Sequence, residues 1–255
     1  MPSRTPTPTA VPAVAPTPEP TPSKSAPSPT PVPTSASSDF YIHYDGFSLL
    51  FNCKEHSAHR FNYTLTTTEK TKDKLSTDYG FDLKMSKDCQ QNSIKGYASG
   101  YDRGDLADKR LMTDGTDQSK AAHYMTNVAP QVSSLNQGMW ALTVNIEACF
   151  RNVSRIYTWG GVVYTSDTSK DHFTKSHGIR TPAYWWKVIL TKDKATNVDK
   201  VIAWYFPNEK LDKKFDEYLV SVADLEAKLN DNNGPIPIPD AIKATKAKQS
   251  WVCPK

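Results

Sequence analysis

The prolines of this chain are concentrated at one end, and this limits what can fold. Twelve of the 19 prolines lie before Asp39, in a segment without Trp, Tyr, Phe or Gly. Such a segment has no hydrophobic face to bury and lacks a backbone donor at every proline, so we expect extended polyproline II conformations. We therefore predict a Pro/Thr/Ser-rich linker or stalk over residues 1–38, with a PxxP ligand for a partner module as the alternative.

The remainder, residues 39–255, contains all 6 Trp, 12 Tyr, 9 Phe and 4 Cys of the chain. This is enough apolar and aromatic material for one sizeable core, so we expect a single domain. The formal charge of +4 is compatible with an anionic partner but identifies none. No stretch approaches the about 20 apolar residues of a membrane span, and we expect no such segment.

The cysteines Cys53, Cys89, Cys149 and Cys253 form no CxxC pair, so a short-spaced zinc site is not indicated. An even number at wide separation favours disulfides in an exported protein, with three possible connectivities, and four buried thiols are the alternative. A secreted or periplasmic location is therefore expected. Because no apolar signal region follows Met1, this location implies that a signal peptide has been removed.

Clusters of β-branched and aromatic residues predict strands at 41–43, 60–66, 155–165, 183–191 and 200–206. We expect the last three to be central strands of an antiparallel sheet. On such a strand Trp185 and Trp186 point to opposite faces, so only one of them is expected to be fully buried. The long polar region 67–120 shows little periodicity, and loops of that length are usually functional.

Two helices are predicted. Ser133 and Ser134 are candidate caps for a helix ending near Phe150, and Ser221 is a candidate cap for a short helix over 222–229. The apolar positions at helical spacing in the first helix are Leu135, Met139, Leu142 and Ile146. The tail from Gly234 is expected to be extended. The fold class is α+β, with a central antiparallel sheet flanked by helices and long loops.

The chemistry is concentrated in three short segments, Tyr-Asp-Arg-Gly-Asp-Leu-Ala at 101–107, Asn-Val-Ala-Pro-Gln at 127–131 and Leu-Asn-Gln-Gly-Met-Trp at 135–140. In this order and spacing they resemble the DNA/RNA non-specific endonucleases, the ββα-metal group of the Serratia nuclease and endonuclease G type. The family signature is Asp-Arg-Gly-His, Asn-x-x-Pro-Gln and Leu-Asn-x-x-x-Trp. This chain departs from it at one residue, since Asp105 stands where the family has its catalytic histidine.

The resemblance implies a ββα-metal nuclease fold and hydrolysis of phosphodiester bonds in DNA and RNA, without sequence preference. It implies a Mg²⁺ ion, or Mn²⁺ in its place, bound by Asn136 and water, since a hard cation prefers oxygen ligands. Arg103 corresponds to the arginine of the motif, and its planar fork suits a phosphate. A structural ion pair with Asp102 or another carboxylate is the alternative. Asn127 and Gln131 match positions around the metal and the phosphate, where they can also order loops.

The family also has a glutamate four residues after the tryptophan and an arginine four residues after that. Here the first of these positions is Val144, whereas Glu147 and Arg151 form an i, i+4 pair displaced by three residues. Either the helix contains a compensating insertion, so that the pair serves phosphate binding, or it is only a surface ion pair.

Asp105 is expected to impair catalysis, because an aspartate is a far weaker base than a histidine and adds negative charge beside a phosphate. General-base assistance supplies about 10² to 10⁴ in rate, so some metal-assisted cleavage can survive. Asp105 can also bind the metal, or a histidine can replace it; the candidates are His123, His172 and His177. The alternatives are an inactive, nucleic-acid-binding relative, natural or engineered, and a structural module with a vestigial site.

Overall fold

The computed structural model describes residues 39–67, 75–98, 100–229 and 231–253. The predicted linker over residues 1–38 lies outside the described residues. Within them, no helix is long and apolar enough to cross a membrane.

The centre of the fold is a seven-stranded sheet in which every neighbouring pair is antiparallel. Its spatial order is β1 (Asp39–Tyr44), β2 (Phe47–Asn52), β3 (Ser57–Leu65), β6 (Ile156–Val163), β7 (Tyr184–Lys192), β8 (Asp199–Pro207) and β9 (Leu219–Val220). The three predicted central strands are confirmed as β6, β7 and β8. Strand β2 escaped the sequence analysis because four of its six residues are buried, which removes the polar alternation of a half-buried strand.

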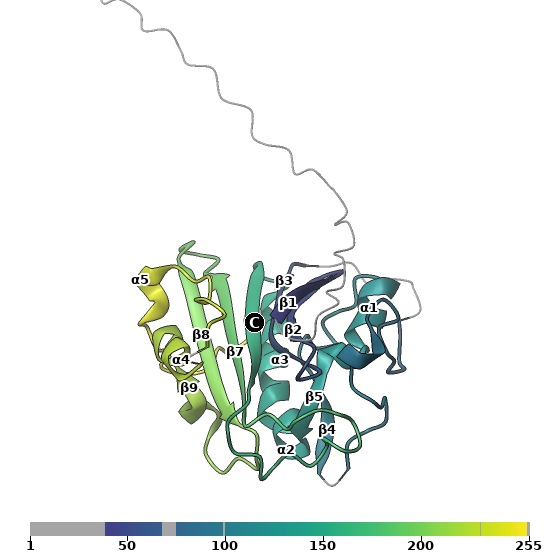
Figure 1. Ribbon diagram of the computed structural model, residues 1–255. Coiled ribbons are helices and arrows are strands. Elements are labelled where there is room, and N and C mark those ends of the chain that lie inside the picture. The colour runs from purple at the N-terminus through teal and green to yellow at the C-terminus, as the bar shows by residue number, and fades with distance from the viewer. Residues whose placement is uncertain (1–38, 68–74, 99, 230, 254–255) are drawn as a thin grey trace, which may run out of the picture.

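Helices cover both faces of this sheet (Figure 1). Helix α3 (Ala141–Phe150) packs on one face, and α4 (Val222–Leu229) and α5 (Asp240–Lys243) pack on the other. Trp185 belongs to the core under α3 and Trp186 to the core under α4, and they are 0% and 1% exposed. The prediction that only one of them is fully buried was therefore wrong, because both faces of β7 are covered.

A separate two-stranded antiparallel sheet precedes α3. It is called the hairpin below, although residues 106–127 connect its two strands. It consists of β4 (Tyr101–Asp105) and β5 (Val128–Val132), and the chain then enters α2 (Ser133–Leu135), a π-helical turn (Asn136–Trp140) and α3. Two strands followed at once by a helix form the ββα unit that the resemblance implied. The region 67–120 is less irregular than expected, since it contains β4, the short turn Lys87–Cys89 and most of α1 (Thr116–Ala122). The remaining short helices are Met125–Asn127 and Phe215–Tyr218.

The helix after β5 begins differently from the prediction. Val132 occupies the cap position, and no side chain among the described residues caps the helix. Ser133 instead donates its hydroxyl to Asp102 Oδ1 at 2.7 Å. The chain then kinks at Gly138, whose backbone angles are not helical, and the helical register shifts, so that Leu142 is 45% exposed rather than in the core. A regular 3.6-residue period cannot reveal such a shift.

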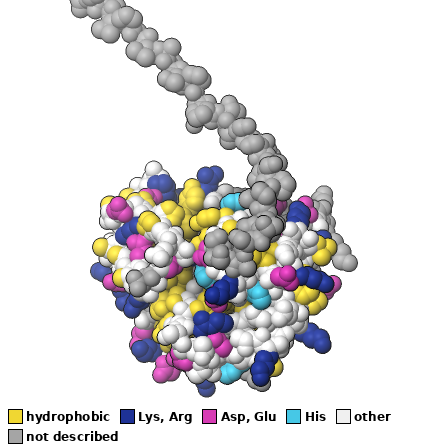
Figure 2. Space-filling view, in the orientation of Figure 1, with side chains coloured by type: hydrophobic (Ala, Val, Ile, Leu, Met, Phe, Trp, Pro, Cys, Tyr) yellow, Lys and Arg dark blue, Asp and Glu magenta, His cyan; other side chains and the backbone are white. Residues whose placement is uncertain are grey.

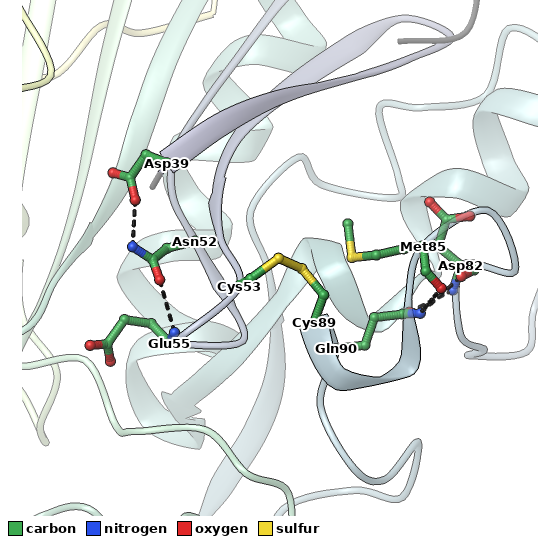
Figure 3. Close-up of a disulfide and its surroundings, with 8 residues drawn as sticks. All are labelled: Asp39, Asn52, Cys53, Glu55, Asp82, Met85, Cys89 and Gln90. Carbon is green, nitrogen blue, oxygen red and sulfur yellow. Dashed lines mark hydrogen bonds between the residues drawn. A yellow bond between two sulfur atoms is a disulfide. The ribbon is translucent and has the colours of Figure 1, made fainter. Parts of the chain in front are cut away.

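Two disulfides cross-link the domain, Cys53–Cys89 and Cys149–Cys253. The first joins the turn between β2 and β3 to the short helical turn at Lys87–Cys89, beside the hydrogen bonds of Gln90 with Asp82 (Figure 3). The expectation of paired cysteines is confirmed, and the structure selects one of the three connectivities.

The C-terminal part confirms one local prediction and corrects another. Ser221 caps α4, since its hydroxyl accepts the backbone N–H of Asp224 at 3.0 Å. The tail after Gly234 is not extended throughout, because α5 forms at Asp240–Lys243 directly after a proline. Proline at the start of a helix costs no hydrogen bond, which explains why the proline-rich run ends in a helical turn.

Candidate nuclease site

The start of the helix is tied to β4 through one carboxylate. Asp102 Oδ2 accepts hydrogen bonds from the side-chain amides of Asn136 at 2.9 Å and Gln137 at 2.8 Å, and Oδ1 accepts the Ser133 hydroxyl. Burial acts to raise the pKa of Asp102, but these three hydrogen bonds outweigh it and hold the pKa below its ordinary value. Asp102 is therefore ionised at neutral pH and orients Asn136.

Arg103 lies over an aromatic ring and forms no ion pair with a carboxylate among the described residues. Its guanidinium carbon is 3.8 Å from the centroid of the Tyr79 ring, and Nη1 donates to the carbonyl of Ile94 at 2.9 Å. The alternative of a structural pair with Asp102 does not hold, because Asp102 is occupied by neutral donors. Arg103 is half-buried, and its other N–H groups are directed to no described acceptor.

Asp105 forms an ion pair at the end of β4. The Lys109 ammonium is 2.5 Å from Oδ2, and the Tyr79 hydroxyl donates to Oδ1 at 3.0 Å. Lys109 also donates to the Tyr79 hydroxyl oxygen at 2.6 Å. Burial raises the pKa of Asp105 to about 6, against the opposing influence of Lys109. The expected extra negative charge at position 105 is therefore balanced by a lysine at neutral pH.

The glycine between Arg103 and Asp105 is required by packing. A Cβ at Gly104 would lie 2.6 Å from Gln131 Cβ and 2.9 Å from a ring carbon of Trp185. Gln131 is fully buried on the paired strand, and neither atom of its side-chain amide has a hydrogen-bond partner among the described residues. The glycine thus lets β4 approach the core closely, with a polar amide enclosed beneath it.

Asn127 is wholly engaged in ordering the loops around the hairpin. Its amide oxygen accepts the N–H of Ala107 at 2.9 Å, and its amide nitrogen donates to the carbonyls of Ala107 and Ala122. The side chain is fully buried. These contacts match the loop-ordering role, and they hold the segment after Asp105 against β5.

Glu147 lies in the core and not beside Asn136. Its Oε2 is 2.7 Å from the Lys187 ammonium, and its Oε1 accepts the hydroxyls of Tyr63 and Thr158, each at 2.7 Å. Glu147 and Lys187 are both 0% exposed. Neither the predicted phosphate contact nor a surface ion pair fits this burial.

Arg151 lies one turn further along α3. It donates to the backbone carbonyls of Thr66 and Leu111, and its Nη2 is 3.3 Å from Asp114 Oδ1. The side chain is largely buried at the end of the helix. These contacts join α3 to the loops on either side of it, which is a structural use of the residue that was expected to bind phosphate.

None of the three candidate histidines contacts Asp105. His123 is buried, with Nδ1 2.8 Å from the carbonyl of Ser119, and its ring centroid is 5.3 Å from that of Tyr79. His177 is buried between Ser176 and the carbonyl of Lys95. His172 is exposed, and its ring is 6.0 Å from the Tyr101 ring. None of these histidines is therefore placed to act together with Asp105 by direct contact.

The residues of β4 form two groups that point in opposite directions, Asp102 with Gly104 and Arg103 with Asp105. Successive residues of a strand alternate, so Asp102 and Gly104 face α2 and the core, whereas Arg103 and Asp105 face Tyr79. The charge of Lys109 nevertheless helps to lower the pKa of Asp102, so the two groups lie within electrostatic reach of each other. Figure 2 shows acidic and basic side chains interspersed over the visible face of the molecule, without a single broad patch of either sign.

The chain belongs to the DNA/RNA non-specific endonuclease family, whose model matches residues 25–238. It is 30% identical to the nuclease of Serratia marcescens over 162 residues, which is 60% of this chain and 58% of that protein. It is 26% identical to human mitochondrial endonuclease G over 142 residues, 50% of this chain and 46% of that protein. The chain thus spans about half the length of the curated relatives that it matches.

The fold agrees with this assignment. The structure matches EndoG from the EndoG/EndoGI inhibitor complex with a TM-score of 0.57 and 17% sequence identity, covering 76% of this chain and 84% of that one. At this identity the match establishes a shared fold. The α+β class and the ββα arrangement are confirmed by it.

The family is metal-dependent, and Asn136 together with Asp102 fits a hydrated hard cation. Asn136 donates its amide N–H to Asp102, which turns the amide oxygen away, and no described residue occupies that oxygen. No group of three or more His, Cys, Asp or Glu that could hold a metal occurs among the described residues. The donor set is therefore one neutral amide oxygen beside an ionised carboxylate, which suits an ion that keeps most of its water.

The sequence analysis missed Tyr79 and Lys109. Lys109 follows Asp105 by four residues, a spacing that can indicate a pair, but the chain is not helical there. Tyr79 is 26 residues from Asp105, in a region without periodicity, and no sequence signal connects the two.

Proposed function

We propose that the protein is a metal-dependent endonuclease that hydrolyses phosphodiester bonds of DNA and RNA without sequence preference. The observation that carries this proposal is the ββα unit, in which β4 presents Arg103 and the helix turn presents the oxygen of Asn136. Family membership supports the same conclusion.

The residues have separate tasks in this proposal. Arg103 binds the phosphate, because its free N–H groups form a planar fork and Tyr79 holds the guanidinium in place. Asn136, oriented by Asp102, would hold Mg²⁺ or Mn²⁺ through its amide oxygen. Such an ion would supply stabilisation of the charge that develops on the phosphate and the leaving oxygen. The buried side chains of Gln131 and Asn127 stabilise the hairpin from its core-facing side.

Cleavage by this chain is slower than in relatives with histidine at position 105. Asp105 is ionised and bound to Lys109 at neutral pH, so its oxygens are poor acceptors for a proton from water. The loss of general-base assistance corresponds to about 10² to 10⁴ in rate. Metal-assisted hydrolysis remains as the residual activity.

The test is cleavage of supercoiled plasmid and of RNA, each with Mg²⁺ and with EDTA. Arg103→Ala and Asn136→Ala should each lower the rate at least tenfold, because they remove the phosphate and metal contacts. Arg155→Ala and Asn145→Ala are matched controls, since both side chains are exposed and lie outside the hairpin. Cleavage that persists unchanged in EDTA, or in both site variants, would contradict the proposal.

A second candidate is a relative that binds nucleic acid without cutting it, and the Asp105–Lys109 pair is the observation that favours it. Retardation of DNA without cleavage at any Mg²⁺ concentration distinguishes this function. Asp105→His should raise the rate if the site is an impaired nuclease. A folded Asp105→His variant without activity would favour the binding function.

The protein is exported in this proposal, to the medium or the periplasm, because two disulfides persist in oxidising compartments. Non-reducing and reducing electrophoresis of protein from the native source should differ in mobility. A protein isolated with four free thiols would contradict an exported location.

A further inference from the structure

The pair at the end of β4 contains a cation whose position is unusually well defined. Lys109 is held by Asp105 Oδ2 at 2.5 Å and by the Tyr79 hydroxyl oxygen at 2.6 Å. Two contacts fix the end of a side chain that otherwise has large rotamer freedom. Its side chain is 35% exposed, against 7% for Asp105. The cation thus faces outward and the carboxylate faces inward.

One N–H donor of the Lys109 ammonium has no acceptor among the described residues. An ammonium has three N–H donors, and Asp105 and Tyr79 accept two of them among the described residues. The third is available to an acceptor from outside. The loss of side-chain freedom opposes the attraction of this partly exposed pair, so the pair contributes little to stability.

The same aromatic ring positions a second cation. Arg103 lies 3.8 Å from the centroid of the Tyr79 ring, and the Lys109 ammonium is 5.1 Å from that centroid. Tyr79 itself remains neutral, since burial and Asp105 raise its pKa to about 12. The group of Arg103, Lys109 and Asp105 therefore has a net charge of about +1 at neutral pH, and both cations adjoin one ring.

From this geometry we infer that Lys109 is a phosphate-binding residue of the candidate site, and that Asp105 is a positioning residue that holds it there. The inference rests on the proposed function for the identity of the ligand, a nucleic-acid backbone. Position 105 then carries out a different task from the histidine that the family has there. It anchors a cation beside Arg103, and the two cations contact neighbouring phosphate oxygens or successive phosphates.

The test is the salt dependence of binding, measured in EDTA so that no cleavage is needed. Fluorescence anisotropy of a labelled DNA duplex over a series of NaCl concentrations gives the slope of log affinity against log salt. Each phosphate contact contributes about 0.9 to that slope on duplex DNA. Lys109→Met should lower its magnitude by about 0.9, whereas Lys109→Arg should retain it.

The matched control is Lys192→Met. Lys192 forms an exposed pair with Asp199 at 2.8 Å and lies on β7, away from the hairpin. Lys192→Met removes the same charge from the molecule as Lys109→Met. An equal loss of slope in both variants would therefore show a general charge effect and overturn the inference. Circular dichroism of each variant establishes that it is folded. A folded Lys109→Met variant with an unchanged slope would also overturn it.

The outcomes separate this inference from the nuclease function. A reduced slope in Lys109→Met with no cleavage by the unmodified protein supports the phosphate contact and contradicts the nuclease. Cleavage by the unmodified protein with an unchanged slope in Lys109→Met supports the nuclease and contradicts the contact. A purely structural role for Lys109 would change the melting temperature but leave the salt slope as it is.

Discussion

Two lysine–carboxylate pairs of nearly equal length have opposite surroundings in this protein. Glu147 and Lys187 are 2.7 Å apart and both 0% exposed, whereas Asp105 and Lys109 are 2.5 Å apart with side chains 7% and 35% exposed. The first pair is enclosed between α3 and the sheet, where Glu147 also accepts the hydroxyls of Tyr63 and Thr158 and the Lys187 ammonium lies over the Trp140 ring. The second is partly open to solvent at Lys109. Similar contact distances therefore accompany a structural pair in one place and a candidate binding group in the other.

A third pair completes the series. Lys192 and Asp199 are 2.8 Å apart, and their side chains are 55% and 32% exposed. Because water screens charge and competes for donors, the contribution of a pair to stability should fall with exposure. Each pair can be broken by the same lysine-to-methionine change, which removes the charge and keeps most of the side-chain volume. Differences in lost stability among the three variants then reflect the surroundings of each pair.

The largest effect is expected for Lys187→Met. It leaves Glu147 as an unpaired charge in the core, which costs about 3 to 5 kcal/mol in the free energy of unfolding. Urea denaturation measures this. The double variant Lys187→Met with Glu147→Leu should recover part of the loss, since no charge then remains buried. Equal stability of Lys187→Met and the unmodified protein would contradict the buried pair.

The next effect is a pH dependence centred on Asp105. Its pKa of about 6 lies above the about 3.9 of an unfolded aspartate, so the folded state binds the proton more tightly. Its contribution to stability is therefore fully present below pH 4 and is lost as pH rises through about 6. The loss is on the order of 2 to 3 kcal/mol. Relative to Asp105→Asn, the unmodified protein should become less stable between pH 4 and pH 6.5, and parallel stability profiles for the two proteins would contradict this.

A smaller effect is expected for Lys109→Met. Solvent reaches this lysine, so its pairing with Asp105 contributes only about 1 kcal/mol at neutral pH. The variant should thus differ from Lys187→Met by several-fold in lost stability while changing the salt slope of DNA binding. Thermal and urea denaturation on the same samples measure the first quantity. A loss as large as that of Lys187→Met would place Lys109 among the structural residues.

The smallest effect is expected for Lys192→Met, within about 0.5 kcal/mol of the unmodified protein. Its pair with Asp199 links adjacent strands at the solvent-exposed end of β7 and β8. Raising the salt concentration to 1 M should remove what remains of the difference, because surface charges are then screened within about 3 Å. A large, salt-resistant loss would contradict the grading by exposure.

Much of the fold could be predicted from the sequence, for identifiable reasons. The strands at 155–165, 183–191 and 200–206 are dense in β-branched and aromatic residues, and Ser221 precedes a short amphipathic segment. The motif segments also located the hairpin and the helix that follow one another as β4, β5 and α2. The kink at Gly138, within Asn136–Trp140, was not predictable, because a break between two helices changes the register without a consistent sequence signal.

The candidate site could be predicted from the sequence only in part. Arg103, Asn136 and Asp105 were found from short, ordered motifs. Glu147 has the residue type and approximate place of a family site residue, but its surroundings are set by Lys187, 40 residues away on β7. Tyr79 and Lys109 escaped because partners in irregular segments have no periodicity to indicate them.

The sequence by itself determined the family motifs and the strand-forming segments, because these depend on residue identity and short spacing. Only the tertiary structure decided what each charge does. It paired Glu147 with Lys187 inside the core and Asp105 with Lys109 at the edge of the hairpin. The physical reason is that the strength of a charge interaction depends on burial and on partners distant in the chain, and neither is a local property of the sequence.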